Sequence, residues 1–355
     1  MTGAWWEYLG IFSASALLCL FLTPVAISAA TRAGVFDHPG GHKSHDSPVP
    51  YLGGLAIVLS FAASVTGAAL LDPPESGSGE LVLVLLLAVG LAVVGLADDL
   101  RNLSPLVRLV VEVLCAVQLW RMDVGITLTG NEAVDVALTV VWVVGITNAF
   151  NLLDNMDGLA AGQAGICAFA VFVIAAANGQ FLVAALAVSL AGCAAGFLRH
   201  NFHPARVYMG DGGALFLGFL IAYLGIKLRF ADSVSSAYLI PMVICVLPIT
   251  DTTLVTLSRL ATGRSPFQGG QDHMSHRMVQ SGVPVAVSVG LTYFASASAG
   301  VLAYVISRVD QLSAWVITGL VAVTALAAAI MLALVPVYPE SRRRRYVIEE
   351  RTDAV

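Results

Sequence analysis

The chain has 355 residues, of which 58% are hydrophobic and only 12% are charged, and its mean hydropathy is +0.85. A soluble domain carries roughly a quarter charged residues, so this composition excludes a soluble protein and indicates an integral membrane protein. The net charge of −5 is spread over few residues, and no basic stripe indicates nucleic-acid binding.

Apolar stretches of membrane-spanning length recur along the chain. A transmembrane helix needs about 20 mainly apolar residues, and on this rule we expect an all-α polytopic membrane protein with 10–11 transmembrane helices. Residues 1–340 are predicted to form one membrane domain, followed by a charged cytoplasmic tail at 341–355. The predicted helices cover residues 5–30, 51–71, 81–97, 105–121, 134–150, 158–177, 180–198, 212–230, 237–256, 283–307 and 311–337.

Basic residues are distributed unequally between the connections. If the N-terminus is outside, 14 of the 18 lysines and arginines lie on the inner side and 4 on the outer side, as the positive-inside bias requires. All seven histidines then fall in cytoplasmic connections. We therefore expect a multi-pass protein of the bacterial plasma membrane with its active site in the cytoplasmic connections. The five cysteines lie in apolar stretches and indicate neither disulfides nor a zinc cluster.

The first two inner connections carry groups suited to phosphate and to a metal ion. His42, Lys43 and His45 supply hydrogen-bond donors that suit phosphate, although a basic loop that only sets topology would look the same. The adjacent carboxylates Asp98 and Asp99 end the third apolar stretch and could hold Mg²⁺, or could be a solvated helix end. In the next stretch, Glu112 has Arg108 one turn away as a partner, which favours a structural role for Glu112.

The third inner connection contains four polar residues at steps of three. Asn148, Asn151, Asp154 and Asp157 would share one helical face, and such a stripe can hydrogen-bond a nucleotide base or ribose. Gly158, which follows the stripe, permits close approach of a ligand to the backbone. Solvent contact alone explains four polar groups in register less well than a binding site does.

The last two inner connections carry an aspartate at a helix start and a pair of histidines. Asp211 is either an ordinary helix cap or part of a site at the helix N-terminus, and Tyr208 is either an interfacial aromatic or a stacking surface. His273 and His276 could bind a transition metal, but no third soft ligand lies near, so phosphate contact is favoured. Asp251 is a further acid within an apolar stretch.

Taken in order, these motifs resemble one enzyme family. They read HKSH…PVPYLGG, GLADDLRNLSP, NAFNLLDNMDGLAAG, VYMGDGGALFLG, LPITDT and DHMSHR. From about residue 30 to 282 the chain resembles the polyprenyl-phosphate N-acetylhexosamine-1-phosphate transferases of glycosyltransferase family 4. That superfamily also includes phospho-N-acetylmuramoyl-pentapeptide transferase. The ordered set carries the resemblance, since no single motif would suffice.

The resemblance implies transfer of a sugar-1-phosphate from a UDP-sugar to polyprenyl phosphate (undecaprenyl or decaprenyl), with release of UMP. This would be the initiating step of a cell-envelope glycan. The implied cofactor is Mg²⁺, with Mn²⁺ as an alternative; the partners are the two substrates and membrane lipid, and a homodimer is left open. The implied catalytic residues are Asp98, Asp99, Asp154, Asp157 and His273; the substrate-binding residues are Lys43, His45, Asn151, Asn201, Tyr208, His276 and Arg277; the metal ligands are Asp211 and Asp99.

Two departures from the family pattern bear on the substrate. Ser275 stands where the family often has a histidine, so one phosphate-contacting imidazole is missing. The acidic-pair motif reads DDLRN, without the lysine usual in the pentapeptide branch, which favours a UDP-N-acetylhexosamine donor. The resemblance does not decide whether Asp98 acts as a base or as a covalent nucleophile. A pentapeptide-branch enzyme is the alternative, and an ion-coupled transporter is a remote one, because the polar residues cluster on one surface and no inverted repeat is evident.

Overall fold

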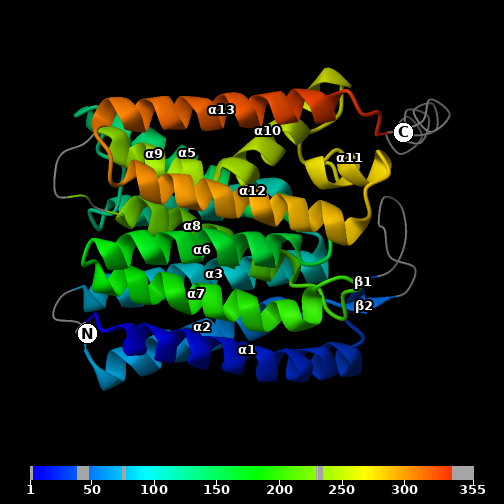
Figure 1. The fold of residues 1–355 in the computed structure, drawn as a ribbon. Helices are drawn as coiled ribbons and strands as arrows, with labels where there is room; N and C mark the ends of the chain where they lie inside the picture. The colour runs from blue at the N-terminus through cyan, green and yellow to red at the C-terminus, as the bar shows by residue number, and fades with distance from the viewer. Residues whose placement is uncertain (1–2, 38–47, 74–76, 229, 231–234, 338–355) are drawn as a thin grey trace.

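Long α-helices running side by side make up most of the chain (Figure 1). A computed structural model describes residues 3–37, 48–73, 77–228, 230 and 235–337, which leaves the predicted tail at 341–355 outside the described residues. The helices are α1 (Trp5–Ala33), α2 (Gly53–Leu71), α3 (Ser78–Arg101), α4 (Pro105–Trp120), α5 (Glu132–Leu153), α6 (Leu159–Ala177), α7 (Phe181–Asn201), α8 (Gly210–Lys227), α9 (Leu239–Ile244), α10 (Val246–Ala261), α11 (Met274–Gln280), α12 (Val285–Ile306) and α13 (Gln311–Ala333). The 3-10 helix η1 (Ser235–Tyr238) and two short strands, β1 (Phe36–Asp37) and β2 (Val49–Pro50), complete the set.

Nine helices within the described ranges are long and apolar enough to cross a membrane, which confirms the prediction of an all-α multi-pass membrane protein. Each of the eleven predicted segments contains a helix. Two of these segments fall short of a full span. The helix α4 has 16 residues, equivalent to about 24 Å of length, and the predicted helix at 237–256 is divided between α9 and α10.

The division between α9 and α10 follows from Pro248. Proline has no N–H to donate to the carbonyl four residues before it, and its ring crowds that carbonyl. Here the carbonyl belongs to Ile244, the last residue of α9, and it accepts a hydrogen bond from Cys167 Sγ of α6 at 3.4 Å instead. Hydropathy does not reveal this break, because both halves are apolar.

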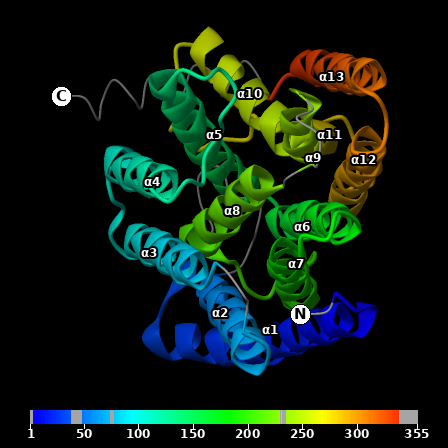
Figure 2. The ribbon, with the colours of Figure 1, turned by 90° about the vertical axis from the view of Figure 1, so that its left-hand side faces the viewer.

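The helix α8 lies at the centre of the bundle, with α3, α5 and α6 around it when the bundle is viewed end-on (Figure 2). All of its residues from Gly212 to Ile226 are buried. Small residues bring the neighbouring backbones close: a Cβ on Gly95 of α3 would lie 2.5 Å from the nitrogen of Gly212. This close approach brings the end of α3 against the first turn of α8.

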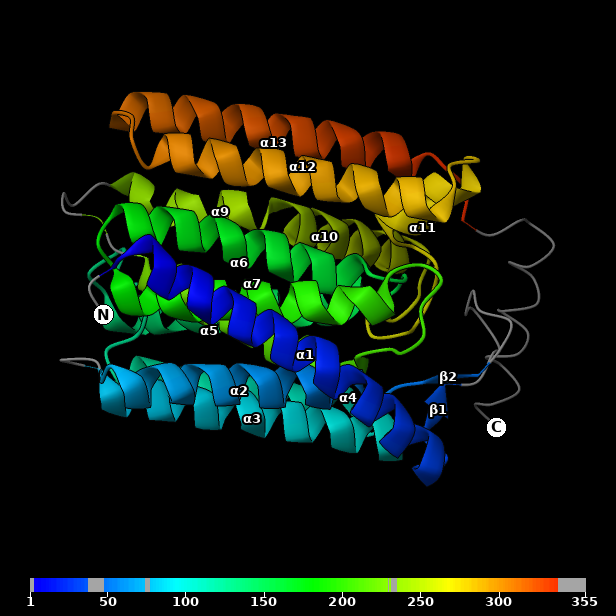
Figure 3. The same ribbon diagram turned by 60° about the horizontal axis from the view of Figure 1, so that its bottom comes forward.

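The polar connections were predicted to share one side, and their described residues do lie together at one end of the bundle. That end carries the antiparallel pair β1–β2 and the helix α11 (Figure 1). Helices that run toward it, such as α3 and α5, end there, and helices that run away from it, such as α6 and α8, begin there. The helix α1 crosses α2 and α7 obliquely on one side of the bundle (Figure 3). Successive crossing by long helices thus gathers segments that are far apart in the sequence.

Candidate active site

A cleft of about 850 Å³ lies among these connections. Its walls come from the last turn of α3, the first turn of α4, the last turns of α5, the first turn of α8, part of α10 and the segment between α10 and α11. Lys43 and His45 fall outside the described residues, and Asn201 and Arg277 do not line the cleft. The other predicted site residues do line it: Asp98, Asp99, Asn151, Asp154, Asp157, Tyr208, Asp211, His273 and His276.

Asp99 connects α3 to the start of α8. Its carboxylate accepts hydrogen bonds from the backbone N–H of Asp211 at 3.0 Å and of Gly212 at 3.4 Å. The first N–H groups of a helix have no partner within the helix, and the positive end of its dipole favours an anion. Gly210 has a positive φ of 69°, and a Cβ atom at this position would clash with the Asp99 carboxylate. Asp99 is thereby fixed beside Asp211.

Arg108 joins the two other carboxylates of this region. Its Nη1 atom lies 2.8 Å from Asp98 Oδ2 and 2.5 Å from Asp211 Oδ2. Asp98 is buried, and its second oxygen accepts a hydrogen bond from the backbone of Leu103 at 2.5 Å. The sequence-based pairing of Arg108 with Glu112 was therefore wrong, since Arg108 turns toward the cleft. Arg108 thus compensates the charge of two carboxylates that line the cleft.

The stripe of amides and carboxylates does not continue as one helical face, because α5 ends at Leu153. Its members still reach the cleft. Asn151 donates a hydrogen bond from Nδ2 to Asp211 Oδ1 at 2.8 Å. Asp157 lies in the following turn, where it accepts hydrogen bonds from His203 Nδ1 at 2.8 Å and from the backbone N–H of Ala205 at 3.0 Å. Asp157 thus holds the segment that leads to Tyr208.

Asp154 differs from these residues because its side chain has no hydrogen-bond partner among the described residues. Burial is the main cause that raises the pKa of Asp154 to about 8, and the negative charges of Asp211 and Asp99 add to the shift. A carboxyl group with a raised pKa in a cleft is a common feature of functional sites. Asp154 lines the same cleft as Asp99 and Asp211.

Tyr208 and Asn201 have different roles, although both had been predicted to bind substrate. Tyr208 lines the cleft, and its backbone pairs with Pro50 and Gly53 at 2.9 and 3.0 Å. Burial and the charge of Asp157 raise the pKa of its phenol. Asn201 is buried, and its Nδ2 donates to the carbonyl of Val207 at 2.9 Å. The predicted contact of Asn201 with substrate is thus not supported by its geometry, because its amide supports the loop that presents Tyr208.

His273 is oriented by a residue to which sequence reasoning gave no role. Its Nδ1 lies 2.7 Å from Asp251 Oδ2, and the other Asp251 oxygen accepts the backbone N–H of Met274 at 2.7 Å. Both partners of the His273–Asp251 pair are about 96% buried, with side-chain exposures of 4% each. Since Nδ1 faces Asp251, Nε2 is the ring nitrogen left for the cleft. His276 lies next to it, with ring centroids 6.1 Å apart.

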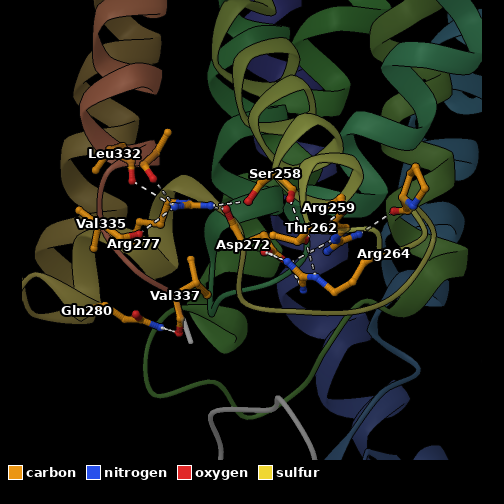
Figure 4. Close-up of polar contacts among 12 residues, drawn as sticks. Ser258, Arg259, Thr262, Arg264, Asp272, Arg277, Gln280, Leu332, Val335 and Val337 are labelled. Atoms are coloured by element: carbon orange, nitrogen blue, oxygen red, sulfur yellow. Dashed lines mark hydrogen bonds and ion pairs between the residues drawn. The ribbon is translucent and has the colours of Figure 1, made fainter. Parts of the chain in front are cut away.

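Arg277 turns away from the cleft, which corrects its predicted contact with substrate phosphate. Its guanidinium donates to the carbonyls of Leu332, Ala333 and Val335 at the end of α13 and to Ser258 Oγ (Figure 4). Carbonyls at a helix C-terminus have no partner within the helix, so they are natural acceptors for arginine. Only 3% of Arg277 is exposed. It fastens α13 to α11, which carries His276.

A buried ion-pair cluster holds the segment before His273 in place. Asp272 accepts hydrogen bonds from Arg264 at 2.5 and 3.1 Å and from Arg259 at 3.3 Å (Figure 4). Burial alone would raise the pKa of Asp272, but the hydrogen bonds and charge of Arg264 and then those of Arg259 hold its pKa below the usual range. These ion pairs hold the residue that directly precedes His273.

Ser275, the departure from the family histidine motif, is buried. Its hydroxyl donates to Asn155 Oδ1 at 2.8 Å, which ties α11 to the turn after α5. Ser275 itself is not among the residues that line the cleft. This position therefore supplies a neutral contact within the protein in place of an imidazole.

The cleft offers oxygen donors that suit a hard cation such as Mg²⁺. The carboxylates of Asp99 and Asp211 lie near that of Asp154, and Arg108 compensates the charge of Asp211. Within the described ranges, however, no three acidic, histidine or cysteine side chains converge as a complete metal site. The donor chemistry of these carboxylates fits the predicted ion.

Comparison with known proteins gives one consistent result. A model of the family described as glycosyl transferase family 4 matches residues 81–229. The chain is 32% identical over 291 residues to a probable undecaprenyl-phosphate N-acetylglucosaminyl 1-phosphate transferase of Bacillus subtilis, covering 79% of this chain and 80% of that protein. It is 29% identical over 324 residues to a decaprenyl-phosphate N-acetylglucosaminephosphotransferase of Mycobacterium tuberculosis, covering 80% of each. It is 34% identical over 239 residues to a phospho-N-acetylmuramoyl-pentapeptide-transferase of Halalkalibacterium halodurans, covering 61% of this chain and 73% of that protein.

Proposed function

The chain belongs to glycosyl transferase family 4, and on this basis we propose that its cleft transfers N-acetylhexosamine-1-phosphate from a UDP-sugar to polyprenyl phosphate. One observation carries the proposal: carboxylates, cations and an aromatic from five separate connections meet in one cleft of about 850 Å³. In the reaction, an oxygen of the lipid phosphate forms a bond to the β-phosphorus of the UDP-sugar. The bond from that phosphorus to the bridging oxygen breaks, and UMP leaves.

The cationic and the acidic residues of the cleft are proposed to have different roles. The two substrates are both anionic and repel each other, so cationic groups are needed to bring them together. Arg108, His273 and His276 are proposed to contact the phosphates. Asp98 holds Arg108 in position through the 2.8 Å ion pair. Asp99 is proposed to act in catalysis as the second carboxylate of the adjacent pair.

The nucleotide is proposed to bind near the end of α5 and the loop before α8. Tyr208 would stack on the uracil ring, and Asn151 and Asp154 would hydrogen-bond the base or ribose. Asp157 supports this surface through its contacts with His203 and Ala205. The arrangement joins an aromatic face to polar groups, which suits a flat heterocycle linked to a sugar.

Asp211 and Asp99 are proposed to hold Mg²⁺, with Mn²⁺ as an alternative. When bound, such an ion would neutralise charge on the diphosphate and stabilise the charge that develops during transfer. The observation that supports a cation here is that the Asp99 carboxylate lies against the backbone N–H of Asp211 at 3.0 Å, so two carboxylates, which are oxygen ligands suited to a hard cation, adjoin in the cleft.

The donor is proposed to be a UDP-N-acetylhexosamine. Two relatives that the chain matches over about 80% of its length carry N-acetylglucosamine in their names, whereas the pentapeptide transferase relative matches over 61%. The acidic-pair motif, which lacks the lysine usual in the pentapeptide branch, agrees with this choice. We further propose that the cleft faces the cytoplasm, with the N-terminus outside, on the grounds of the 14-to-4 distribution of the basic residues.

Purified protein in detergent tests the proposal. UDP-N-acetylglucosamine and decaprenyl phosphate should give UMP and a lipid product heavier by N-acetylhexosamine phosphate, identified by mass spectrometry. UDP-N-acetylmuramoyl-pentapeptide offered in competition should give little product. Excess EDTA should abolish UMP release, and added Mg²⁺ or Mn²⁺ should restore it; full turnover in EDTA would contradict the proposed metal dependence.

A further inference from the structure

Glu112 is a buried carboxylate that the proposed chemistry does not use. It lies in α4 with 0% of its surface exposed, and its Oε2 accepts a hydrogen bond from Asn148 Nδ2 of α5. Its other oxygen, Oε1, is buried without a partner in the described part of the chain. A buried polar atom without a partner lowers stability, so stability alone explains Glu112 poorly.

The contact with Glu112 determines which way the Asn148 amide faces. Asn148 Nδ2 donates both to Glu112 and to the backbone carbonyl of Val144, the latter at 2.9 Å. A backbone carbonyl can only accept a hydrogen bond, so the amide atom beside Val144 must be the nitrogen. Both N–H bonds of Asn148 are thus used inside the protein, and its carbonyl oxygen Oδ1 is left over.

That oxygen belongs to the cleft. Asn148 lines the cleft one turn along α5 from Asn151, and no partner for its Oδ1 is found among the described residues. Asn148 therefore presents the cleft with a group that accepts a hydrogen bond and cannot donate one. A phosphate dianion carries no donor, whereas a nucleotide sugar carries ring N–H, hydroxyl and acetamido N–H groups.

We propose that Asn148 Oδ1 accepts a hydrogen bond from an N–H or O–H group of the nucleotide sugar, and that Glu112 is a positioning residue that fixes the Asn148 amide for this contact. The inference rests on the proposed function, because it assumes a nucleotide-sugar donor. Glu112 and Asn148 then favour this substrate over the lipid phosphate at this part of the cleft.

Steady-state kinetics with UDP-N-acetylglucosamine and decaprenyl phosphate test the inference. Asn148→Ala and Glu112→Leu should each raise KM for UDP-N-acetylglucosamine roughly 3- to 10-fold, the value of one neutral hydrogen bond. KM for decaprenyl phosphate should stay within about twofold in both variants, since the contact is with the other substrate. Glu112→Leu keeps the packing volume, and a monodisperse profile in detergent checks its folding.

Two further variants separate positioning from a merely structural role. Glu112→Gln should behave like the parent enzyme, because the glutamine carbonyl can still accept from Asn148 Nδ2. The double variant Glu112→Leu/Asn148→Ala should be no worse than Asn148→Ala, because Glu112 acts through Asn148. If Glu112→Leu does not fold, Asn148→Ala and Glu112→Gln still decide the matter.

Several results would overturn the inference. These are an unchanged KM for UDP-N-acetylglucosamine in Asn148→Ala, an equal rise in KM for decaprenyl phosphate, Glu112→Gln as impaired as Glu112→Leu, or effects that multiply in the double variant. Absence of turnover by the unsubstituted protein would be a different result: it would overturn the proposed function, and this inference with it.

Discussion

His273→Ala is expected to reduce activity severely. His273 is 3% exposed and lines the cleft, and its Nδ1 is held 2.7 Å from Asp251 Oδ2. The ring can therefore present Nε2 to a substrate phosphate without losing freedom on binding. One charge-assisted hydrogen bond contributes about 1.5–3 kcal/mol, so its loss should lower the rate roughly 10- to 100-fold.

Ser275→Ala provides the matched control two residues further along, in the first turn of α11, which begins directly after His273. The Ser275 hydroxyl contacts Asn155 within the protein at 2.8 Å and does not line the cleft. Removing it deletes one neutral hydrogen bond, and Asn155 lines the cleft, where water can take the lost position. The rate should therefore stay within about threefold of the parent enzyme.

UMP release at saturating concentrations of both substrates, with monodispersity in detergent as the folding check, distinguishes the two variants. The reasoning assigns the loss to a missing imidazole at the cleft and not to damage in α11. Near-parental turnover by a folded His273→Ala protein would refute it and remove this histidine from the site. Equal losses in the two variants would instead show that α11 tolerates no change.

Three other predictions follow from the same structure. Tyr208→Ala should mainly raise KM for the UDP-sugar, because stacking is lost equally in the ground and transition states. Asp211→Asn should instead mainly lower kcat. The same change of KM and kcat in both variants, measured by steady-state kinetics, would refute these roles. A thiol reagent that cannot cross membranes should label Ser78→Cys but not Ser265→Cys in intact cells, against a low background because all five native cysteines are buried; the reverse pattern would invert the proposed orientation. The lowered pKa of Asp272 means that its ion pairs stabilise the fold above the unfolded-state pKa, and that this stability is lost as pH falls below about 4. Thermal melts in detergent should show that acid-dependent loss in the parent protein, and the loss should be missing from Asp272→Asn.

The spans and the common end of the polar connections could be predicted from the sequence for a physical reason. A bilayer requires long apolar helices with internally satisfied backbones, so the hydropathy of segments such as 159–177 nearly determines their structure. Alternate crossing then assigns Asp99, Asp154 and Asp211 to the same end without any knowledge of packing. Residues of the cleft could be predicted from the sequence because polar groups at the ends of apolar stretches indicate a functional site.

Which polar groups pair with one another was decided only by the tertiary structure. Local spacing favoured Arg108 with Glu112, but helix packing brings Asp98 and Asp211 to Arg108, the latter across 103 positions of the sequence. The same packing offers the carbonyls at the end of α13 to Arg277, which therefore leaves the cleft, and places Asp251 beside His273. Long side chains reach several partners, and the choice among them depends on backbones that meet only in the folded bundle.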